Sequence, residues 1–339
     1  MSGFTPRTIL VTGGAGFIGS NFVRYVLYVN NAVKVVNLDA LTYAGSEENL
    51  VNLPDPNRHT FVHGDICDHD LVSCLLQEHA IDTIVHFAAE SHVDRSIAGP
   101  EAFIRTNVQG TFTLLEEARK YWLEHQHWDE ARCRFHHIST DEVYGTLGPG
   151  DPPFTETTSY APNSPYSASK AAADHFVRAY QHTYLLPTTT TNCSNNYGPY
   201  QHSEKFMPTV IRACLKGQPI PVYGDGSNFR DWLYVEDHCV GIWKVIEKGR
   251  IGETYNIGGS NHWSNLDIAT LLCRTVAKVT GETPDKILSL ISFVKDRPGH
   301  DWRYAIDSRK IQTELGWQPA HSFEDGIRKT VEWYWERNE

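Results

Sequence analysis

The stretch "TILVTGGAGFIGSNF", residues 8–22, decides the fold class of this chain. An apolar, β-branched run leads through the spacing Gly13-x-x-Gly16-x-x-Gly19 into a helical pattern. Glycines at this spacing allow a tight turn, a close approach of the backbone to a pyrophosphate and close packing of a helix on a sheet. The following helix N-terminus offers free N–H groups to phosphates. The stretch predicts a dinucleotide site, with an ordinary βα turn as the alternative.

An acidic residue supports the dinucleotide interpretation. Asp39 lies 20 residues beyond Gly19, at the end of the next strand-like run. Its carboxylate would accept hydrogen bonds from ribose hydroxyls and repel a 2′-phosphate, which favours NAD over NADP. Two later strand-like runs end at Asp65-Ile66 and Ala88-Ala89, where a parallel sheet forms its ligand crevice. For the two alanines, simple core packing is an equal alternative.

Apolar runs and helical patterns alternate through the first half of the chain. The strand candidates are 8–13, 34–39, 59–65, 83–89, 134–140 and 188–195, with helical segments such as 17–29 and 107–124 between them. The runs are apolar throughout, which predicts a doubly wound, Rossmann-like parallel sheet covered on both faces. After residue 197, Gly, Pro and aromatic residues become frequent. We expect an NAD-binding domain over 1–197 and a smaller α/β substrate lobe over 198–339, with the chain recrossing around 230–260.

Composition excludes several classes of protein. The 339 residues carry a net charge of −11, which argues against a nucleic-acid surface. The seven cysteines are scattered and none forms C-x-x-C, so we expect reduced thiols, no disulfide framework and no metal site. No apolar run approaches the length of a membrane span. The N-terminus enters a strand within a few residues, which leaves no room for a signal peptide and predicts a cytoplasmic protein.

Two polar motifs point to chemistry. Tyr166-x-x-x-Lys170 puts a phenol and an ammonium group on one helix face, where the lysine would lower the tyrosine pKa from roughly 10 and make it a base. In "STDEVYG", Asp141 and Glu142 directly follow Thr140 at the end of a strand. Neighbours on a strand point to opposite faces, so both carboxylates serve one site only if the strand has ended. A surface helix face and a solvated loop are the alternatives for these motifs.

Together these residues resemble a known family. The glycine turn with Tyr166-x-x-x-Lys170 is similar to the extended short-chain dehydrogenase/reductases. "STDEVYG", "HFAAESHVDRS", "TNCSNNYGPY", "RDWLYVEDH" and "DRPGHDWRYAID" resemble the dTDP-glucose 4,6-dehydratases, and the similarity runs over nearly the whole chain. It implies an NAD-dependent lyase that converts dTDP-glucose to its 4-keto-6-deoxy product and water. Thr140-Asp141-Glu142 is the most discriminating element, because related epimerases lack the Asp-Glu pair.

The resemblance also implies roles for the catalytic residues. Tyr166 would take the C4 hydroxyl proton as hydride leaves for NAD, with Lys170 holding the nicotinamide ribose. Glu142 would remove the C5 proton and Asp141 would protonate the leaving C6 hydroxyl. Thr140 would bind the O4 region. A carboxyl pair in a dry site titrates as a unit, so the assignment of the proton to Asp141 comes from the family and not from spacing.

The resemblance also implies which residues contact the cofactor and the substrate. The predicted cofactor contacts, besides Tyr166 and Lys170, are Gly13, Gly16, Phe17, Ile18, Gly19, Asp39, Leu41, Thr42, Asp65, Ile66, Ala88, Ala89, Ser91, Thr106 and Asn196. The predicted substrate contacts, besides Thr140, Asp141 and Glu142, are His92, Asn195, Lys205, Phe206, Pro221, Tyr223, Arg230, Asn265, Arg297, His300 and Tyr334. Arg230 and Arg297 suit a diphosphate because guanidinium binds it in a bidentate fashion, and surface ion pairs are their alternative.

The sequence departs from the family pattern in two places, and several other functions are compatible with it. Ala40 in "DALT" replaces a lysine of the family, and "YQHSEK" differs from the family's usual loop, which affects the expected cofactor and substrate contacts. An epimerase, a dehydratase of a UDP- or GDP-linked sugar, or a non-catalytic NAD-binding sensor are the other functions considered. A homodimer is implied by the family, with helices over 107–124 and 166–184 pairing across subunits.

Overall fold

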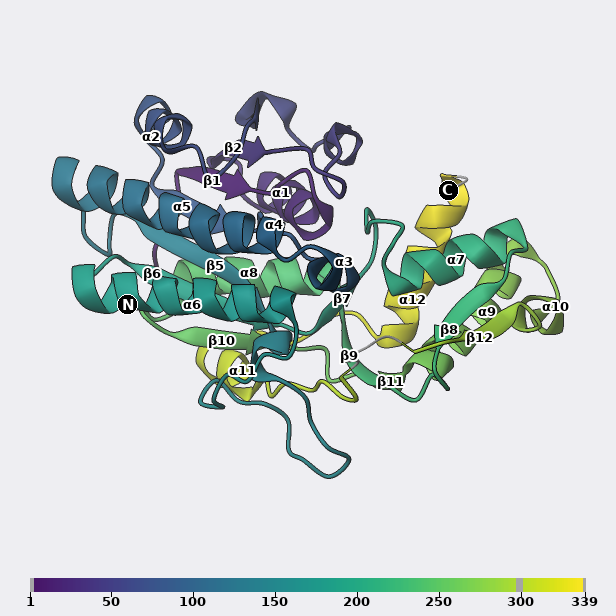
Figure 1. The fold of residues 1–339 in the computed structure, drawn as a ribbon. Coiled ribbons are helices and arrows are strands. Elements are labelled where there is room, and N and C mark those ends of the chain that lie inside the picture. Colours follow the sequence, from purple (N-terminus) through teal and green to yellow (C-terminus); the bar gives the residue numbers. More distant parts are fainter. Residues whose placement is uncertain (1–2, 297–300, 338–339) are drawn as a thin grey trace.

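The computed structural model describes residues 3–296 and 301–337, and a parallel sheet of seven strands forms its centre (Figure 1). The strands run in the order β10-β6-β5-β4-β1-β2-β3, and every neighbouring pair is parallel. Their bounds are β1 Thr8–Thr12, β2 Lys34–Asp39, β3 His59–His63, β4 Thr83–His86, β5 Arg134–Thr140, β6 Thr188–Cys193 and β10 Thr254–Ile257. The predicted Rossmann-like doubly wound sheet is confirmed.

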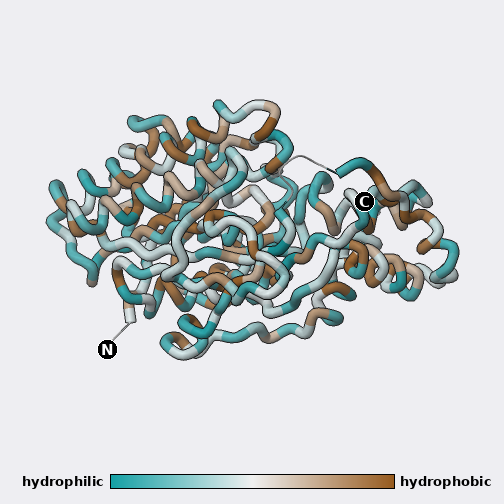
Figure 2. The backbone as a smooth tube through the Cα atoms, turned by 60° about the horizontal axis from the view of Figure 1, so that its bottom comes forward, coloured by the Kyte–Doolittle hydropathy of each residue, from teal (hydrophilic) through white to brown (hydrophobic). Residues whose placement is uncertain are grey.

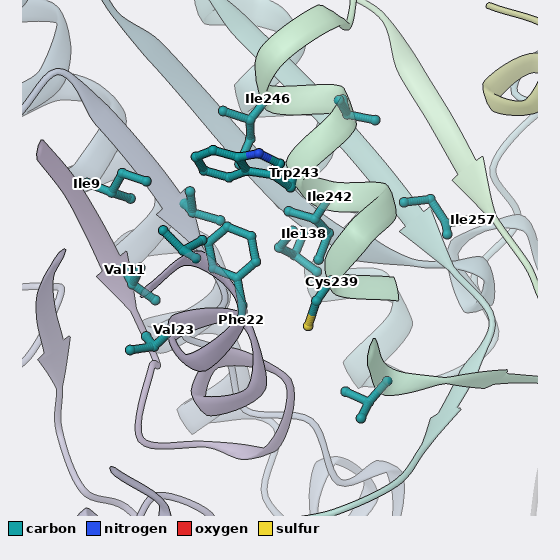
Figure 3. Close-up of a cluster of buried hydrophobic side chains, with 14 of the residues drawn as sticks. Ile9, Val11, Phe22, Val23, Ile138, Cys239, Ile242, Trp243, Ile246 and Ile257 are labelled. Atoms are coloured by element: carbon teal, nitrogen blue, oxygen red, sulfur yellow. The ribbon is translucent and has the colours of Figure 1, made fainter. Parts of the chain in front are cut away.

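Helices cover both faces of this sheet, and its central strands are buried along their whole length. One face is covered by α1 (Phe17–Val29), α8 (Val235–Lys248) and α11 (Arg309–Leu315). Phe22 of α1 and Trp243 of α8 meet Ile9 and Val11 of β1 in this layer, as Figure 3 shows. Burial of one such side chain is worth about 1.5–3 kcal/mol. The layer holds the glycine turn against the sheet.

The opposite face is covered by α2 (His69–Glu78), α5 (Thr111–Ala118) and α6 (Pro165–Tyr184). The run predicted over 107–124 belongs to a longer helical stretch that begins with α4 (Glu101–Phe103). A π-helical segment, Ile104–Gly110, joins α4 to α5, and a second one, Arg119–His125, follows α5. α3 (Val93–Ala98) precedes it. Leu114, Trp122 and Val177 bury their side chains in this layer.

The second half of the chain builds most of a smaller lobe beyond the carboxyl end of the sheet (Figure 1). Its helices α7 (Phe206–Lys216), α9 (Asn265–Thr280) and α12 (Phe323–Glu336) share a separate hydrophobic core, and α10 (Pro284–Leu288) lies beside them. Two small sheets complete it, from β7 (Asn195–Tyr197), β9 (Phe229–Tyr234) and β11 (His262–Ser264), and from β8 (Ile220–Tyr223) and β12 (Ile291–Val294). Between these segments α8 and β10 return to the main sheet, so the chain crosses between the two parts more than once.

Hydropathy follows this layering. In Figure 2, brown hydrophobic positions recur along the helices between teal hydrophilic ones, as expected for helices with one buried face. Short 3₁₀ turns, Glu47–Leu50, Pro56–Arg58 and Asp141–Tyr144, follow strands or lie in loops. Within residues 3–296 and 301–337, no helix is both long and apolar enough to cross a membrane.

Candidate active site

A cavity of about 630 Å³ lies at the carboxyl ends of β1, β2, β4, β5 and β6. Ligands of open α/β sheets bind at this edge, where strand order reverses around β1 and β4. Residues from the glycine turn, from the loops after the strands, from α6 and from the loop before α7 line it.

The glycine turn forms one end of the cavity. Gly13 has φ of +71°, and a Cβ there would lie 2.6 Å from the amide nitrogen of Ala88. A Cβ at Gly19 would lie 2.3 Å from the carbonyl oxygen of Gly13. Gly16 is the N-cap of α1 and offers no capping side chain, so the first N–H groups of the helix are available at the cavity. This turn fits a diphosphate group.

Asp39 lies beside the turn at the end of β2. Its Oδ2 accepts a hydrogen bond from the Ala15 N–H at 2.9 Å, and its Oδ1 accepts one from the Leu41 N–H at 2.8 Å. Burial raises the pKa of Asp39, and these two N–H groups act against that rise. The carboxylate therefore both shapes the turn and lines the cavity, and the residues present fit an NAD group.

The structure brings the predicted cofactor residues together. All of them except Leu41 line the cavity. Leu41 has φ of +48° and contributes its backbone N–H to Asp39. Their roles toward NAD stay predictions.

The carboxylate pair lies where β5 ends. Thr140 has extended dihedral angles and caps the 3₁₀ turn Asp141–Tyr144, since its Oγ1 accepts a hydrogen bond from the Glu142 N–H at 3.3 Å. The turn closes at Gly145, which has φ of +96°. Because the strand has ended, Asp141 and Glu142 no longer alternate across the sheet. Glu142 lines the cavity, and Asp141 lies buried directly behind it, 2% exposed.

The two carboxyl groups have different electrostatic environments. Burial and then the neighbouring charge of Glu142 raise the pKa of Asp141 well above its ordinary value, while Arg230 acts in the opposite direction. Asp141 Oδ2 has no hydrogen-bond partner among the described residues. A buried, protonated carboxyl group with a free oxygen is suited to donate a proton to a ligand.

Tyr166 and Lys170 lie in the first two turns of α6, which begins with a capping box between Ser164 and Ser167. Both side chains line the cavity, and Lys170 Nζ donates a hydrogen bond to the Ile138 carbonyl at 2.8 Å.

The predicted lowering of the Tyr166 pKa is wrong when only the groups of the protein itself act on Tyr166. Burial, followed by the charge of Glu142, raises the pKa of Tyr166 well above its ordinary value. Burial also lowers the pKa of Lys170. The penalty of burying a phenolate beside a carboxylate sets the direction of this shift, which the motif spacing did not reveal.

Only part of the predicted substrate set reaches this cavity. Asn195 and Lys205 line it. His92 begins α3 near Glu204, at 3.9 Å between His92 Nε2 and the carboxylate. Arg297 and His300 lie outside the described residues.

The remaining predicted substrate residues lie in the lobe and do not line the cavity. Arg230 is buried beside Asp141 and donates hydrogen bonds to the carbonyls of Phe229 and Asp301, so the surface ion pair considered as its alternative is wrong. The hydroxyl of Tyr334 donates to the Gln201 carbonyl at 2.6 Å. The others are Phe206 at the start of α7, Pro221 and Tyr223 on β8, and Asn265 at the start of α9.

Several lining residues escaped the motif analysis. Among them are Glu90, Arg105, Cys193, Ser194, Gln201 and His202. Glu90, Cys193 and Ser194 lie at or just past the ends of β4 and β6, so the strand-end rule that selected Ala88 would have found them. Gln201 and His202 belong to the "YQHSEK" loop, whose departure from the family affects the expected contacts, and Arg105 carries no comparable signal.

Comparisons with known proteins agree with this geometry. Residues 10–330 match the family described as GDP-mannose 4,6 dehydratase. The chain is 57% identical over 328 residues to a dTDP-glucose 4,6-dehydratase of Xanthomonas campestris pv. campestris, covering 96% of this chain and 93% of the relative. The chain belongs to the dTDP-glucose 4,6-dehydratase family.

Solved structures agree with membership of the dTDP-glucose 4,6-dehydratase family. The DesIV dTDP-glucose 4,6-dehydratase of Streptomyces venezuelae, with NAD and TYD bound, superposes with a TM-score of 0.88 at 47% identity over 98% of both chains. A UDP-glucose 4-epimerase of Thermotoga maritima reaches 0.85 at 29% identity, over 98% of this chain and 100% of that one. The fold is shared with epimerases, so the distinction rests on sequence identity and on residues of the site.

Proposed function

We propose that this protein is an NAD-dependent hydro-lyase that converts dTDP-glucose to the 4-keto-6-deoxy sugar nucleotide and water. The single observation that carries the proposal is the turn Thr140-Asp141-Glu142, which adds a buried acid and a cavity-lining carboxylate to the Tyr166–Lys170 pair of a dinucleotide site. Identity of 57% to a curated dTDP-glucose 4,6-dehydratase supports the same substrate.

The residues divide the reaction into three tasks. NAD supplies a hydride acceptor for C4 and a hydride donor for C6, so the reaction needs no external oxidant. Tyr166 would take the C4 hydroxyl proton once the positive charge of bound NAD offsets the burial that raises its pKa in the protein alone. The resulting ketone makes the C5 proton acidic. Glu142 removes that proton, and Asp141 gives its own proton to the departing C6 hydroxyl. Glu142 then returns a proton to C5.

Burial is what allows the two carboxyl groups to differ. Burial and the charge of Glu142 raise the pKa of Asp141 and so favour its protonated form, whereas Glu142 meets the cavity. A raised pKa on one partner of a close carboxyl pair is the usual basis for separate acid and base roles. The strand end at Thr140 is therefore a functional feature of the fold.

The nucleotide and the assembly are part of the proposal. We assign dTDP because the relative with 57% identity is a dTDP-glucose enzyme, although the matching family description names GDP-mannose. We also propose a homodimer in the cytoplasm, the setting expected of a sugar-nucleotide enzyme with scattered free cysteines.

The test uses the purified protein without added NAD. We expect 4-keto product and release of water from dTDP-glucose, with much lower turnover of UDP-glucose and GDP-mannose at equal concentration. Epimerised sugar, or faster turnover of either other nucleotide, would contradict the assignment. Absence of reaction with all three, from protein that contains NAD, would favour the non-catalytic sensor.

A further inference from the structure

The proposed reaction leaves a proton imbalance in the protein after each turnover. Tyr166 gains the proton of the C4 hydroxyl, and Asp141 loses one to the departing water. Glu142 takes a proton from C5 and returns one, so its balance is zero. Hydride leaves C4 and arrives at C6, so electrons also balance. Before the next turnover, Tyr166 must lose one proton and Asp141 must gain one.

We propose that the Thr140 hydroxyl returns this proton directly, from the Tyr166 phenol to the Asp141 carboxylate, without exchange with bulk water. The inference rests on the proposed function and adds a second role to Thr140, beyond binding the O4 region. In the transfer, the phenol O–H bond breaks as a new bond forms to Thr140 Oγ1, while the original Thr140 hydroxyl proton moves to Asp141.

The position of Thr140 supports this path. It lines the cavity with Tyr166, and its Oγ1 lies 3.5 Å from Asp141 Oδ1. The same hydroxyl acts on the Tyr166 phenol by hydrogen bonding. The contact with Asp141 is long, as catalytic hydrogen bonds often are in proteins without substrate, where they tighten on binding.

The hydrogen-bonding capacity of Thr140 fits a one-way relay. A hydroxyl has one donor and two acceptor positions. One acceptor position is used by the Glu142 N–H at 3.3 Å. That leaves one acceptor position for the Tyr166 hydroxyl and the single donor for the Asp141 carboxylate, which is the arrangement required once the water has left.

The buried setting favours an internal path over an exchange with solvent. Asp141 is 2% exposed and Tyr166 is 9% exposed. The proton that leaves O4 is then the one that replenishes the acid for the next water.

The test separates the first turnover from later ones in the NAD-loaded protein. Thr140→Val removes the hydroxyl at nearly constant volume. Rapid quenching should show a burst of about one 4-keto product per active site, followed by turnovers roughly 10²-fold slower, the lower end of what proton transfer by a positioned side chain contributes. Thr140→Ser, which keeps the hydroxyl, should show no burst. Thr190→Val on β6 is the matched control, since Thr190 does not line the cavity, and it should behave as the unaltered protein.

The outcomes discriminate between the possible failures. If Thr140→Val slows the first and later turnovers equally, or leaves both unchanged, the relay is wrong, because a role only in binding O4 gives no burst. If Thr140→Val does not retain NAD, Thr140→Ala takes its place and the same burst is required. If the unaltered protein forms no 4-keto product from dTDP-glucose, the proposed function fails instead.

Discussion

At the scale of single residues, two neighbouring carboxyl groups of equal charge lie in different surroundings. Asp141 is enclosed by the protein and Glu142 meets the cavity, because a 3₁₀ turn replaces strand geometry after Thr140. The environment therefore distinguishes the two carboxyl groups, one enclosed by protein and one at the cavity.

Removing the charge of Glu142 should stop the reaction after oxidation. In Glu142→Gln, Tyr166 still accepts the C4 proton, so hydride reaches NAD, but C5 keeps its proton. Loss of a general base costs about 10²–10⁴-fold in turnover. We expect reduced cofactor to accumulate on mixing with dTDP-glucose, read by absorbance of the reduced nicotinamide. Normal turnover of Glu142→Gln would remove its role. Glu156→Gln, another carboxylate, which accepts the Asn256 N–H outside the cavity, is the control.

A second buried carboxylate, that of Asp174, favours the charged form of Lys170. Asp174 lies one helical turn further along α6 and accepts hydrogen bonds from Ser139 Oγ at 2.8 Å, Tyr160 at 2.9 Å and His137 Nε2 at 3.0 Å. Burial raises the pKa of Asp174 to about 6, and Lys170 acts against that rise. In turn Asp174 is the main group that opposes the lowering of the Lys170 pKa by burial.

Asp174→Asn should therefore lower the pKa of Lys170 further. Lys170 would then lose its proton at a lower pH. A nearby opposite charge shifts a pKa by about 1–3 units, so the alkaline limb of the plot of kcat/KM against pH should move to a lower pH by roughly one unit. His137 and His175 also face this carboxylate, and burial keeps the pKa of His137 well below its ordinary value, so it stays neutral. Ser139→Ala removes a hydrogen bond without changing charge and should leave the limb in place. If the alkaline limb stays at the same pH in Asp174→Asn, Asp174 has only a structural role.

At the scale of elements, the periodicity of the sequence predicts regular segments well. The helix expected over 17–29 is found over Phe17–Val29, and the strand expected over 134–140 over Arg134–Thr140. Four other strands end one to three residues before the expected limit, because Gly13 and residues such as Ala88 already turn toward the cavity. The π-helical segments around α5 leave no signal in the pattern, since they depend on packing against α6 and α2.

Loop contacts across the cavity are the other part that periodicity could not predict. Arg95 of α3 forms a double hydrogen bond with Glu204, at 2.8 and 3.0 Å, and its guanidinium lies 4.0 Å from the ring centre of Tyr43. Lys205 Nζ donates to the Ser91 carbonyl at 2.8 Å. These residues, which we call the strap, join the loops after β2 and β4 to the loop before α7 at the edge of the cavity.

Breaking the strap should speed the loss of NAD. An exposed ion pair and an exposed cation–π contact are each weak, so we expect NAD to dissociate severalfold faster from Arg95→Gln. The measurement is the dissociation rate of NAD after dilution, with activity restored by added NAD. Arg328→Gln, which breaks exposed ion pairs on α12, should not change that rate.

A charge swap tests the strap directly. Arg95→Glu combined with Glu204→Arg restores opposite charges, so the double variant should retain NAD better than either single variant. If Arg95→Gln releases NAD at the unaltered rate, the strap does not control cofactor exchange.

At the scale of the whole molecule, the described residues of this one chain form a cavity at the edge of the main sheet. Its described lining comes from the sheet edge, α1, α6 and the loop before α7. The composition shift near residue 197 indicated the lobe, and the return of β10 to the main sheet lies within the expected recrossing at 230–260. The division into two domains stays an interpretation, because α8 packs in the same hydrophobic layer as α1.

The outer face of the α5 and α6 layer is the surface that we expect to pair in a homodimer. Exposed hydrophobic side chains gather there, namely Ile104, Phe112, Phe176, Tyr184 and Leu185, with exposed fractions of 36–74%. The rings of Phe112 and Phe176 lie 6.5 Å apart, which joins the two helices into one apolar face. A self-complementary face of this kind suits a twofold interface, in which each side chain is buried twice.

Phe176→Glu should therefore convert the dimer to a monomer. A twofold interface would bring two unpaired carboxylates into an apolar contact, which its affinity cannot offset. Sedimentation should show half the mass for Phe176→Glu, while Tyr28→Glu, at a 77% exposed position on α1, should remain dimeric. Because the cavity is lined by one chain, the monomer should keep its turnover within about tenfold, or about 1.4 kcal/mol in the barrier. A dimer that survives Phe176→Glu would place the interface elsewhere, and a monomer without activity would mean that pairing holds Tyr166 and Lys170 of α6 in position.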